Sequence, residues 1–146
     1  MRMKFSLSSA LKLCLFSFIT IAYLASCSST KSVPFTTSTV SPGAEGTVKI
    51  KKDQNGNYSI DVNIKDLVDP GKLTPSSDTY VVWIETKESG TKNIGQIQSS
   101  SGMFSGRKAS ITTVSNERPI KVFVTAEDDP KKELPGTQIV LTTETF

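Results

Sequence analysis

Apolar and polar residues alternate over residues 46–64 of this chain, and strict alternation is typical of a half-buried β-strand. Val48 and Ile50 alternate with lysines, and the apolar positions of the next run are Tyr58, Ile60, Val62 and Ile64. Between the two runs lies Asn55-Gly56, the pair favoured in two-residue hairpin turns. We therefore predict a β-hairpin over this region.

Later segments are equally short, although their patterns differ. Residues 80–84 are apolar at every position, which predicts a central strand covered on both faces. Residues 92–98 follow a turn at Gly90 and are expected to pair back with that strand, with Gly95 marking a β-bulge. Further strands are expected at residues 108–114, 119–126 and 137–143.

Turn-forming residues separate these strands, and the expected loops span residues 66–78, 99–106 and 128–136. About seven short strands and no amphipathic helix of useful length predict an all-β fold. The spacing favours an antiparallel β-sandwich of immunoglobulin-like type, and an open barrel is the structural alternative.

The N-terminal region has the pattern of a secretory signal. Arg2, Lys4 and Lys12 precede an uncharged, mostly apolar run of 12 residues, 13–24. A membrane-spanning helix needs about 20 residues, so this run has the length of a signal-peptide core instead.

The tetrapeptide Leu24-Ala25-Ser26-Cys27 resembles a bacterial lipobox. In such signals the cysteine becomes the first mature residue and carries a thioether-linked diacylglycerol, which implies lipid attachment and membrane anchoring at Cys27. The alternative is an ordinary secretory signal with an incidental cysteine. Cys14 is the rival acceptor, but Leu13 before it is not a small residue.

Three regions follow from this reading. We expect a lipoprotein signal peptide at residues 1–26, a Ser/Thr/Pro-rich tether at 27–44 and a β-sandwich domain at 45–146. The alternative for the tether is an added edge strand containing Val33, Phe35 and Val40. An aspartate after the cysteine retains bacterial lipoproteins in the inner membrane, so Ser28 implies the outer membrane, and the domain is expected to face the periplasm.

The charge balance removes one class of partner. The whole chain has 17 Lys and Arg against 14 Asp and Glu, but three of the basic residues lie in the signal. The remaining 17 − 3 = 14 basic residues balance the 14 acidic ones, so we expect no nucleic-acid partner. Histidine is absent, which removes the commonest general base and metal ligand.

Residues 80–95, 124–127 and 134–141, taken in order, resemble the C-terminal extracytoplasmic domain of anti-sigma-K factors. Residues 80–85 (YVVWIE), with Gly90 and residues 93–95 (NIG), are similar to its "Y-x-x-W-(apolar) … G … (apolar)-G" core. Residues 124–127 (VTAE) resemble its "V-T-x-E" segment, and residues 134–141 (LPGTQIVL) its closing "P-x-G-x-(apolar)-V-L" stretch, although Pro135 and Gly136 are adjacent here. The resemblance implies an extracytoplasmic β-sandwich. It does not carry the anti-sigma activity, which belongs to a separate cytoplasmic domain of those factors.

Few residues suit catalysis or metal binding. Trp83 is expected in the core of a central strand rather than on a binding surface. Residues 127–129 (EDD) could offer oxygens to calcium, but the lysines close by favour a solvated loop. Asp66 and Asp69 are expected to form turns, with a metal role shared with Asp78 as the alternative.

Two loop features complete the candidates. The serines at residues 99–101 have Lys108 as a conceivable activating base, without a supporting motif. Met103 and Phe104 are expected to plug one end of the sandwich, or else to contact a partner. We expect no cofactor and no enzymatic activity.

The leading hypothesis is a cell-envelope lipoprotein whose sandwich is a non-catalytic binding module for an envelope protein. It predicts a contiguous exposed patch or an open sheet edge. The alternative is a passive structural lipoprotein with a uniformly polar surface. A small hydrolase or metal-dependent enzyme is a second alternative, and it predicts a pocket with convergent carboxylates and a nucleophile.

Overall fold

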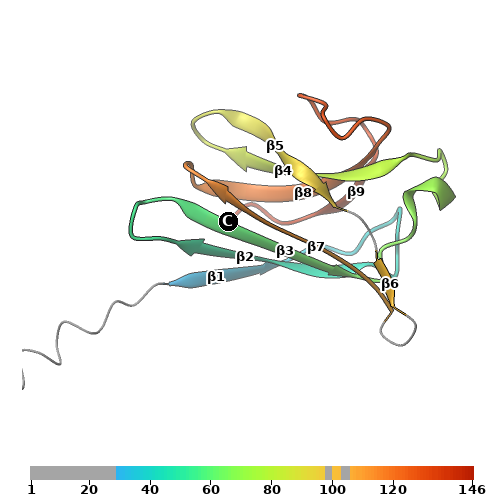
Figure 1. Cartoon of the computed structure of the whole chain (residues 1–146), viewed down its shortest axis with the longest axis horizontal. Coiled ribbons are helices and arrows are strands. Elements are labelled where there is room, and N and C mark those ends of the chain that lie inside the picture. The colour runs from blue at the N-terminus through green and yellow to red at the C-terminus, as the bar shows by residue number, and fades with distance from the viewer. Residues whose placement is uncertain (1–28, 98–99, 103–105) are drawn as a thin grey trace, which may run out of the picture.

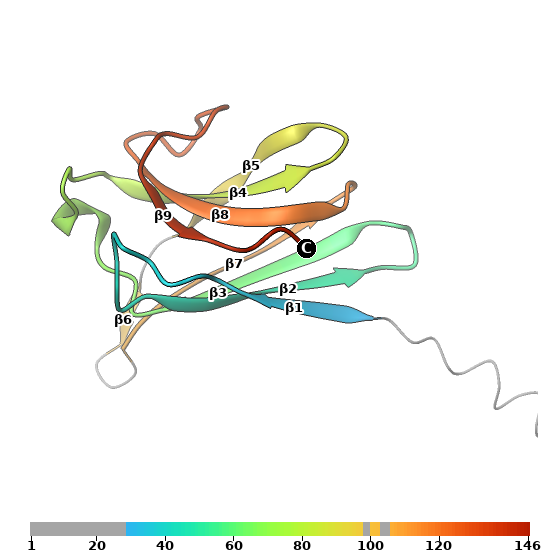
Figure 2. The same cartoon turned by 180° about the vertical axis from the view of Figure 1, so that it is seen from behind.

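The chain folds into two stacked antiparallel sheets, shown from opposite sides in Figures 1 and 2. The computed structural model describes residues 29–97, 100–102 and 106–146. The strands are β1 (Thr30–Pro34), β2 (Glu45–Lys52), β3 (Tyr58–Lys65), β4 (Thr79–Thr86), β5 (Gly90–Ile97), β6 (Ser100–Gly102), β7 (Gly106–Ser115), β8 (Pro119–Glu127) and β9 (Ile139–Thr142), with a 3-10 turn, η1 (Pro70–Lys72), between β3 and β4. One sheet has the order β1-β2-β3-β7-β6, and the other has the order β5-β4-β8-β9.

This order is that of an immunoglobulin-like sandwich. β2, β3, β7 and β6 take the places of strands A, B, E and D, and β4, β8 and β9 take those of C, F and G. β5 adds a strand beside β4, as C′ does in variable-type domains, and β1 adds one outside β2. The predicted fold class is therefore confirmed, with nine strands in the described residues rather than about seven.

The predicted hairpin forms the centre of the first sheet. β2 and β3 pair from Glu45 opposite Lys65 to Lys52 opposite Tyr58. Gly56, at φ 88°, takes the left-handed conformation that the connecting turn requires. The inward residues of the two strands are buried and belong to the main core, which they form together with β4 and β8: Val48, Ile50, Ile60, Val62, Ile64, Tyr80, Val82, Ile84, Val122 and Val124.

β4 is covered on both faces, as predicted. Its residues are buried from Thr79 to Ile84, and Trp83 lies on the face opposite Val82 and Ile84, outside the main core. The predicted bulge is also confirmed, because the pairing of β4 with β5 shifts register at Val82 and Trp83, opposite Gly95. Gly95 has a φ of 127°, which favours glycine.

The tether predicted for residues 27–44 is wrong from residue 30 onward. β1 pairs with β2 in antiparallel register, and Val33, opposite Val48, is 7 % exposed. Phe35 then forms an isolated bridge with Thr143 of the other sheet. The alternative of an edge strand is therefore the correct one for Val33, and the sandwich begins at Thr30 rather than at residue 45.

Thr36, Ser38 and Ser41 of this segment bond through their side chains to other parts of the sandwich. The Ser38 hydroxyl donates to the Val140 carbonyl at 2.5 Å, and the Ser41 amide donates to the Ser38 hydroxyl at 2.8 Å. Both serines are buried. The Ser/Thr/Pro content of residues 27–44 suggested a solvated tether, but the buried hydroxyl of Ser38 bonds to a strand distant in sequence.

Two smaller expectations also differ. Part of the loop predicted for residues 99–106 is strand β6, which pairs with β7. In the last strand Ile139 is 49 % exposed, whereas Val140 and Leu141 are buried. The pairing of β8 with β9 shifts register between Val124 and Thr125, which breaks the simple alternation on which the prediction relied.

Candidate functional site

A second, smaller apolar cluster lies on the outer face of the β5-β4-β8-β9 sheet. It contains Val81, Trp83 and Phe123. Trp83 is fully buried, and its ring stacks on that of Phe123, its partner across the strands, at 6.3 Å between centroids with 14° between the ring planes. The core interpretation of Trp83 is confirmed, although the core is not the one between the sheets.

A chain of hydrogen bonds runs from this tryptophan to a buried carboxylate. Trp83 Nε1 donates to the Thr125 hydroxyl at 2.7 Å, and that hydroxyl donates to Glu127 Oε1 at 2.6 Å. Glu127 also accepts from Lys132 Nζ at 2.8 Å and from the Gly136 amide at 2.6 Å. The carboxylate therefore holds the β8–β9 loop, residues 128–138, to the sheet beneath it.

Opposing effects set the pKa of Glu127. Burial favours the neutral carboxyl, but the hydrogen bonds from Lys132, Thr125 and Gly136 outweigh it and hold the pKa below its ordinary value. The expectation of a solvated loop is thus wrong for Glu127, which is 2 % exposed, and correct for Asp128 and Asp129, which are exposed.

The three segments that resemble the anti-sigma-K domain meet around this chain of bonds. Trp83 comes from the first segment, Thr125 and Glu127 from the second, and Gly136 from the third. Asn93 adds a further link, because its Nδ2 donates to the carbonyls of Pro130 and Lys132, each at 2.9 Å. These residues fasten the β8–β9 loop, so their role in this structure is architectural.

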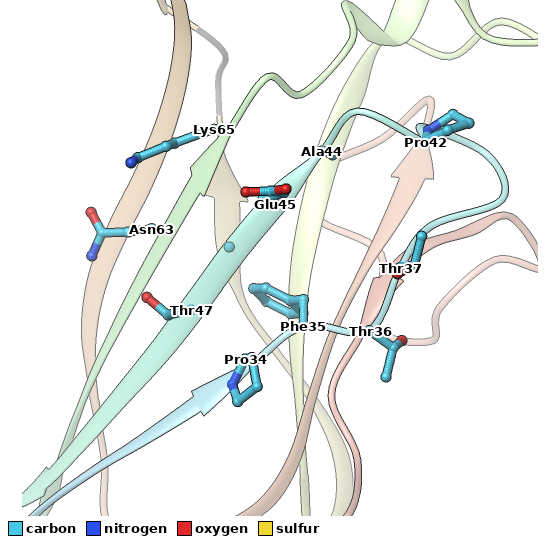
Figure 3. Close-up of a pocket in the computed structure, with 11 residues that line it drawn as sticks. Pro34, Phe35, Thr36, Thr37, Pro42, Ala44, Glu45, Thr47, Asn63 and Lys65 are labelled. Carbon is cyan, nitrogen blue, oxygen red and sulfur yellow. The ribbon is translucent and has the colours of Figure 1, made fainter.

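A surface hollow lies at the far end of β1 and is shown in Figure 3. We call it the Phe35 pocket; it has a volume of about 490 Å³ and is lined by residues 34–37, 42, 44–47, 63 and 65. Figure 3 shows the Phe35 ring between the chain that leaves β1 and the start of β2. Two backbone bonds fix that chain: the Phe35 amide donates to the Gly46 carbonyl at 3.0 Å, and the Thr36 amide donates to the Thr142 carbonyl at 2.8 Å.

Gly46 makes the position of Phe35 possible. A Cβ at this residue would lie 2.7 Å from the Asn63 carbonyl oxygen and 2.9 Å from Phe35 Cδ2. Both distances are shorter than real Cβ contacts, so only glycine lets the ring lie this close to the sheet.

The pocket offers mixed polar and apolar contacts. Phe35 and two prolines, Pro34 and Pro42, supply apolar surface, and Thr36 and Thr37 supply hydroxyls. On the sheet side Glu45 faces Lys65 across the strands, and Thr47 faces Asn63. Such a lining suits a small polar ligand that hydrogen-bonds while resting on an aromatic ring. Nothing in the sequence singled out this pocket, because its walls come from segments that pair only in the folded chain.

Asp66 and Asp69 lie between β3 and η1. Asp69 caps η1, accepting a bond from the Gly71 amide at 3.0 Å, as expected of a turn former. Asp66 has a φ of 54°, a left-handed conformation that aspartate tolerates in turns. In the described part of the chain no group of three or more acidic, cysteine or histidine side chains is positioned to share a metal ion. Ser100 lies opposite Lys108 in the backbone register of β6 and β7.

Several predictions fall on residues that the structure does not describe. Cys27, the expected lipid attachment site, lies outside the described residues, as do Ser99, Met103 and Phe104. Within the described residues, no helix combines the length and apolar character needed to cross a membrane.

Comparison of this chain with models of known protein families, with curated proteins and with solved structures found no match.

Proposed function

We propose that this protein is a bacterial cell-envelope lipoprotein, anchored by acyl chains on Cys27, whose immunoglobulin-like sandwich is a non-catalytic binding module. One observation carries the proposal: a tetrapeptide that resembles a lipobox, at residues 24–27, is followed by a folded domain that begins at Thr30. Multiple acyl chains anchor a protein stably without a transmembrane helix. Ser28 after the cysteine supports an outer-membrane location with the domain facing the periplasm.

The Phe35 pocket supports a binding role over a passive one. Its volume of about 490 Å³ lies within the range of small-ligand sites. The polar groups on its walls lie beside an aromatic ring. A chain without histidine is poorly equipped for acid–base catalysis at such a site, which supports binding rather than turnover.

The resemblance to the outer domain of anti-sigma-K factors supports the same class of function. Its three segments are linked by the chain of hydrogen bonds from Trp83 through Thr125 to Glu127 and Gly136, which gives a physical reason for the three patterns to occur together. A role beside an envelope signalling protein is the form of the proposal that this resemblance favours.

A passive structural lipoprotein is the second candidate, and the surface favours it in one respect. The large apolar side chains exposed in the described part of the chain are Val114, Leu134 and Ile139, which come from β7, the β8–β9 loop and β9. A partner that needs a broad apolar face is therefore not supported, and the binding role depends on the pocket.

Anchoring is tested by mass spectrometry of the processed protein from cells. We expect an acylated N-terminal Cys27, and we expect Cys27→Ser to abolish acylation and release the protein from the membrane. Cys14→Ser is the matched control, because this residue is discarded with the signal and its loss leaves acylation unchanged. An unmodified amino terminus, or a retained signal, would contradict the proposal.

Binding is tested by photocrosslinking in intact cells. A photoreactive residue replaces Thr37, which is exposed in the Phe35 pocket, or Thr112, which is exposed on β7. Capture of a specific partner at Thr37 and not at Thr112 supports the binding module. Crosslinks between copies of this chain, or none at either position, favour the structural lipoprotein.

A further inference from the structure

The folded domain starts almost at the anchor. Ser29 is already described, and it lies two residues beyond Cys27, so at most about 7 Å separates the two α-carbons. A flexible tether of the length first predicted would have averaged about 20–25 Å. Because residues 30–44 belong to the sandwich, the end of the domain that holds Ser29 stays beside the lipid to which Cys27 is attached.

This anchor end consists of the start of β1, the β2–β3 turn and the β7–β8 turn, which lie together in Figures 1 and 2. It carries a hollow of about 310 Å³ whose lining includes Ser29, Lys31, Lys52, Tyr58, Arg118 and Phe146. Lys31 Nζ lies 5.0 Å from the centre of the Phe146 ring, and Lys52 Nζ lies 5.6 Å from the centre of the Tyr58 ring. The three cations are exposed.

Neighbouring carboxylates reduce this positive charge without cancelling it. Glu117, next to Arg118, pairs with Lys92 Nζ at 2.6 Å. Asp53, next to Lys52, accepts bonds from the amides of Asn55 and Asn57 within the β2–β3 turn, each at 2.8 Å. The described lining of the hollow contains three cationic side chains and no acidic one.

One loop at the opposite end of the sandwich is acidic. The β3–β4 loop carries Asp66, Asp69 and Asp78 against one lysine, Lys72. A domain that is neutral overall but basic at one end is oriented by a negatively charged surface, with its basic end inward.

We propose that the anchor end docks on the anionic phospholipid headgroups of the membrane that holds Cys27, with Lys31, Lys52 and Arg118 contacting headgroup phosphates. The proposal rests on the proposed function, because it needs an acylated cysteine. Tyr58 is an aromatic residue of the kind that lies at the headgroup level. Docked in this way, the domain presents the Phe35 pocket, at the far end of β1, away from the membrane.

The test uses the acylated protein in phosphatidylcholine vesicles with and without phosphatidylglycerol, containing a headgroup-attached quencher. Cys27 is consumed by the anchor, so a single new cysteine can carry a fluorophore: Asn55→Cys at the anchor end, or Glu133→Cys in the β8–β9 loop. Both positions are exposed. We expect quenching at residue 55 on phosphatidylglycerol vesicles, weaker quenching on pure phosphatidylcholine, and little quenching at residue 133 on either.

The deciding variant replaces Lys31, Lys52 and Arg118 by glutamine. At roughly fivefold per basic residue, it is expected to lower the ratio of docked to undocked domain about 100-fold, and added salt is expected to act in the same direction. Its matched control replaces Lys65, Lys72 and Lys131, which are also exposed, and leaves quenching unchanged.

Equal quenching at residues 55 and 133 overturns the proposal. Quenching at residue 55 that changes neither with the phosphatidylglycerol content nor with the triple substitution also overturns it. Circular dichroism of each variant shows whether it is folded. Mass spectrometry of the same preparation reports acylation separately: an unacylated protein overturns the proposed function, whereas an acylated protein that does not orient overturns only the docking.

Discussion

Glu127 is a buried carboxylate that holds the β8–β9 loop over the outer face of the β5-β4-β8-β9 sheet. Its side chain is 1 % exposed and accepts bonds from Thr125, Lys132 and Gly136. A buried carboxylate is stable only when its oxygens are paired, and here the donors come from the sheet and from the loop above it.

Glu127→Ala is expected to lower the free energy of unfolding by about 2–3 kcal/mol, because the Thr125 hydroxyl and the Gly136 amide lose their acceptor. Lys132 is partly exposed and can turn to water, so its share is small. Urea unfolding measures the change. Glu133→Ala, at an exposed position of the same loop, is the control, with a change within about 0.5 kcal/mol. Equal effects of the two substitutions would contradict the role of Glu127.

Gly46 shapes the Phe35 pocket because it has no side chain where the Phe35 ring and the Asn63 carbonyl approach the backbone. Gly46→Ala is expected to destabilise the protein by about 1–3 kcal/mol, because the new methyl group collides with the Asn63 carbonyl and the Phe35 ring. Thermal or urea unfolding measures the loss, and any ligand captured at the pocket should bind more weakly. Gly43→Ala is the matched control, since a Cβ there meets nothing within 4 Å. A loss of similar size at Gly43 would show that the space around Gly46 is not the cause.

Among the elements, the segment from β1 to residue 44 is joined to the last strand by side-chain bonds. The Ser38 hydroxyl donates to the Val140 carbonyl and accepts from the Ser41 amide, so one buried side chain connects a loop to β9.

Ser38→Ala is expected to cost about 1–2 kcal/mol of stability, because both partners stay buried without their bonds. Hydrogen exchange gives a second measurement, in which the Thr36 amide, bonded to Thr142, should lose protection. Thr39→Ala, at the exposed neighbouring position, should change neither quantity. A free tether would instead show rapid exchange at Thr36 in the unsubstituted protein.

Glu117 joins two turns at the end of the sandwich where β1 begins. Its carboxylate accepts from Lys92 Nζ and the Thr86 hydroxyl, each at 2.6 Å, and from the Ser89 hydroxyl at 2.7 Å, which links the β7–β8 turn to the β4–β5 turn. The hydrogen bond from Lys92 is the largest of the causes that lower the pKa of Glu117 from 4.5 to about 2.

Because the pKa of Glu117 is lowered in the folded protein, the stability that this residue contributes decreases as the pH falls. The contribution of Glu117 to stability is fully present above its ordinary value of 4.5 and is lost as the pH falls from 4.5 towards 2. Urea midpoints measured across this range should therefore converge for the unsubstituted protein and Glu117→Gln as the solution becomes more acidic. A difference between the two that stays constant from pH 6 to pH 2 would contradict the assignment.

At the scale of the whole molecule, two apolar clusters share the same strands. β4 and β8 present one face to the main core and the other face to the Trp83 cluster. Because the two clusters share these strands, we expect them to unfold together.

Trp83 is the single tryptophan of the chain, so its fluorescence reports the outer cluster alone. We expect its unfolding transition in urea to coincide with that of far-ultraviolet circular dichroism, which reports the sheets, because small domains with shared strands unfold cooperatively. In the folded protein acrylamide should quench the emission weakly, since the ring is fully buried. A fluorescence change that precedes the loss of strand signal would show that the loop and its cluster open separately.

Local signals made the central strands predictable. The hairpin of β2 and β3 follows from period-two alternation around Asn55-Gly56, and the bulge in β5 follows from Gly95, because both depend on neighbours in sequence. β1 was not predictable in this way. Its segment has the Ser/Thr/Pro content of a tether. The side-chain bonds of Thr36 and Ser38, which hold the chain that follows β1, reach residues 106 and 102 positions away in the chain.

The sequence by itself determined the alternation of the strands, the all-β class and a tetrapeptide that resembles a lipobox, because each depends on the spacing of adjacent residues. Only the tertiary structure decided which hydroxyls are buried, that Trp83 lies beneath a loop, that Phe35 borders a pocket, and that three cations line one hollow beside Ser29. These features depend on contacts between segments remote in the chain, where burial and bonding follow from the way the two sheets close on each other.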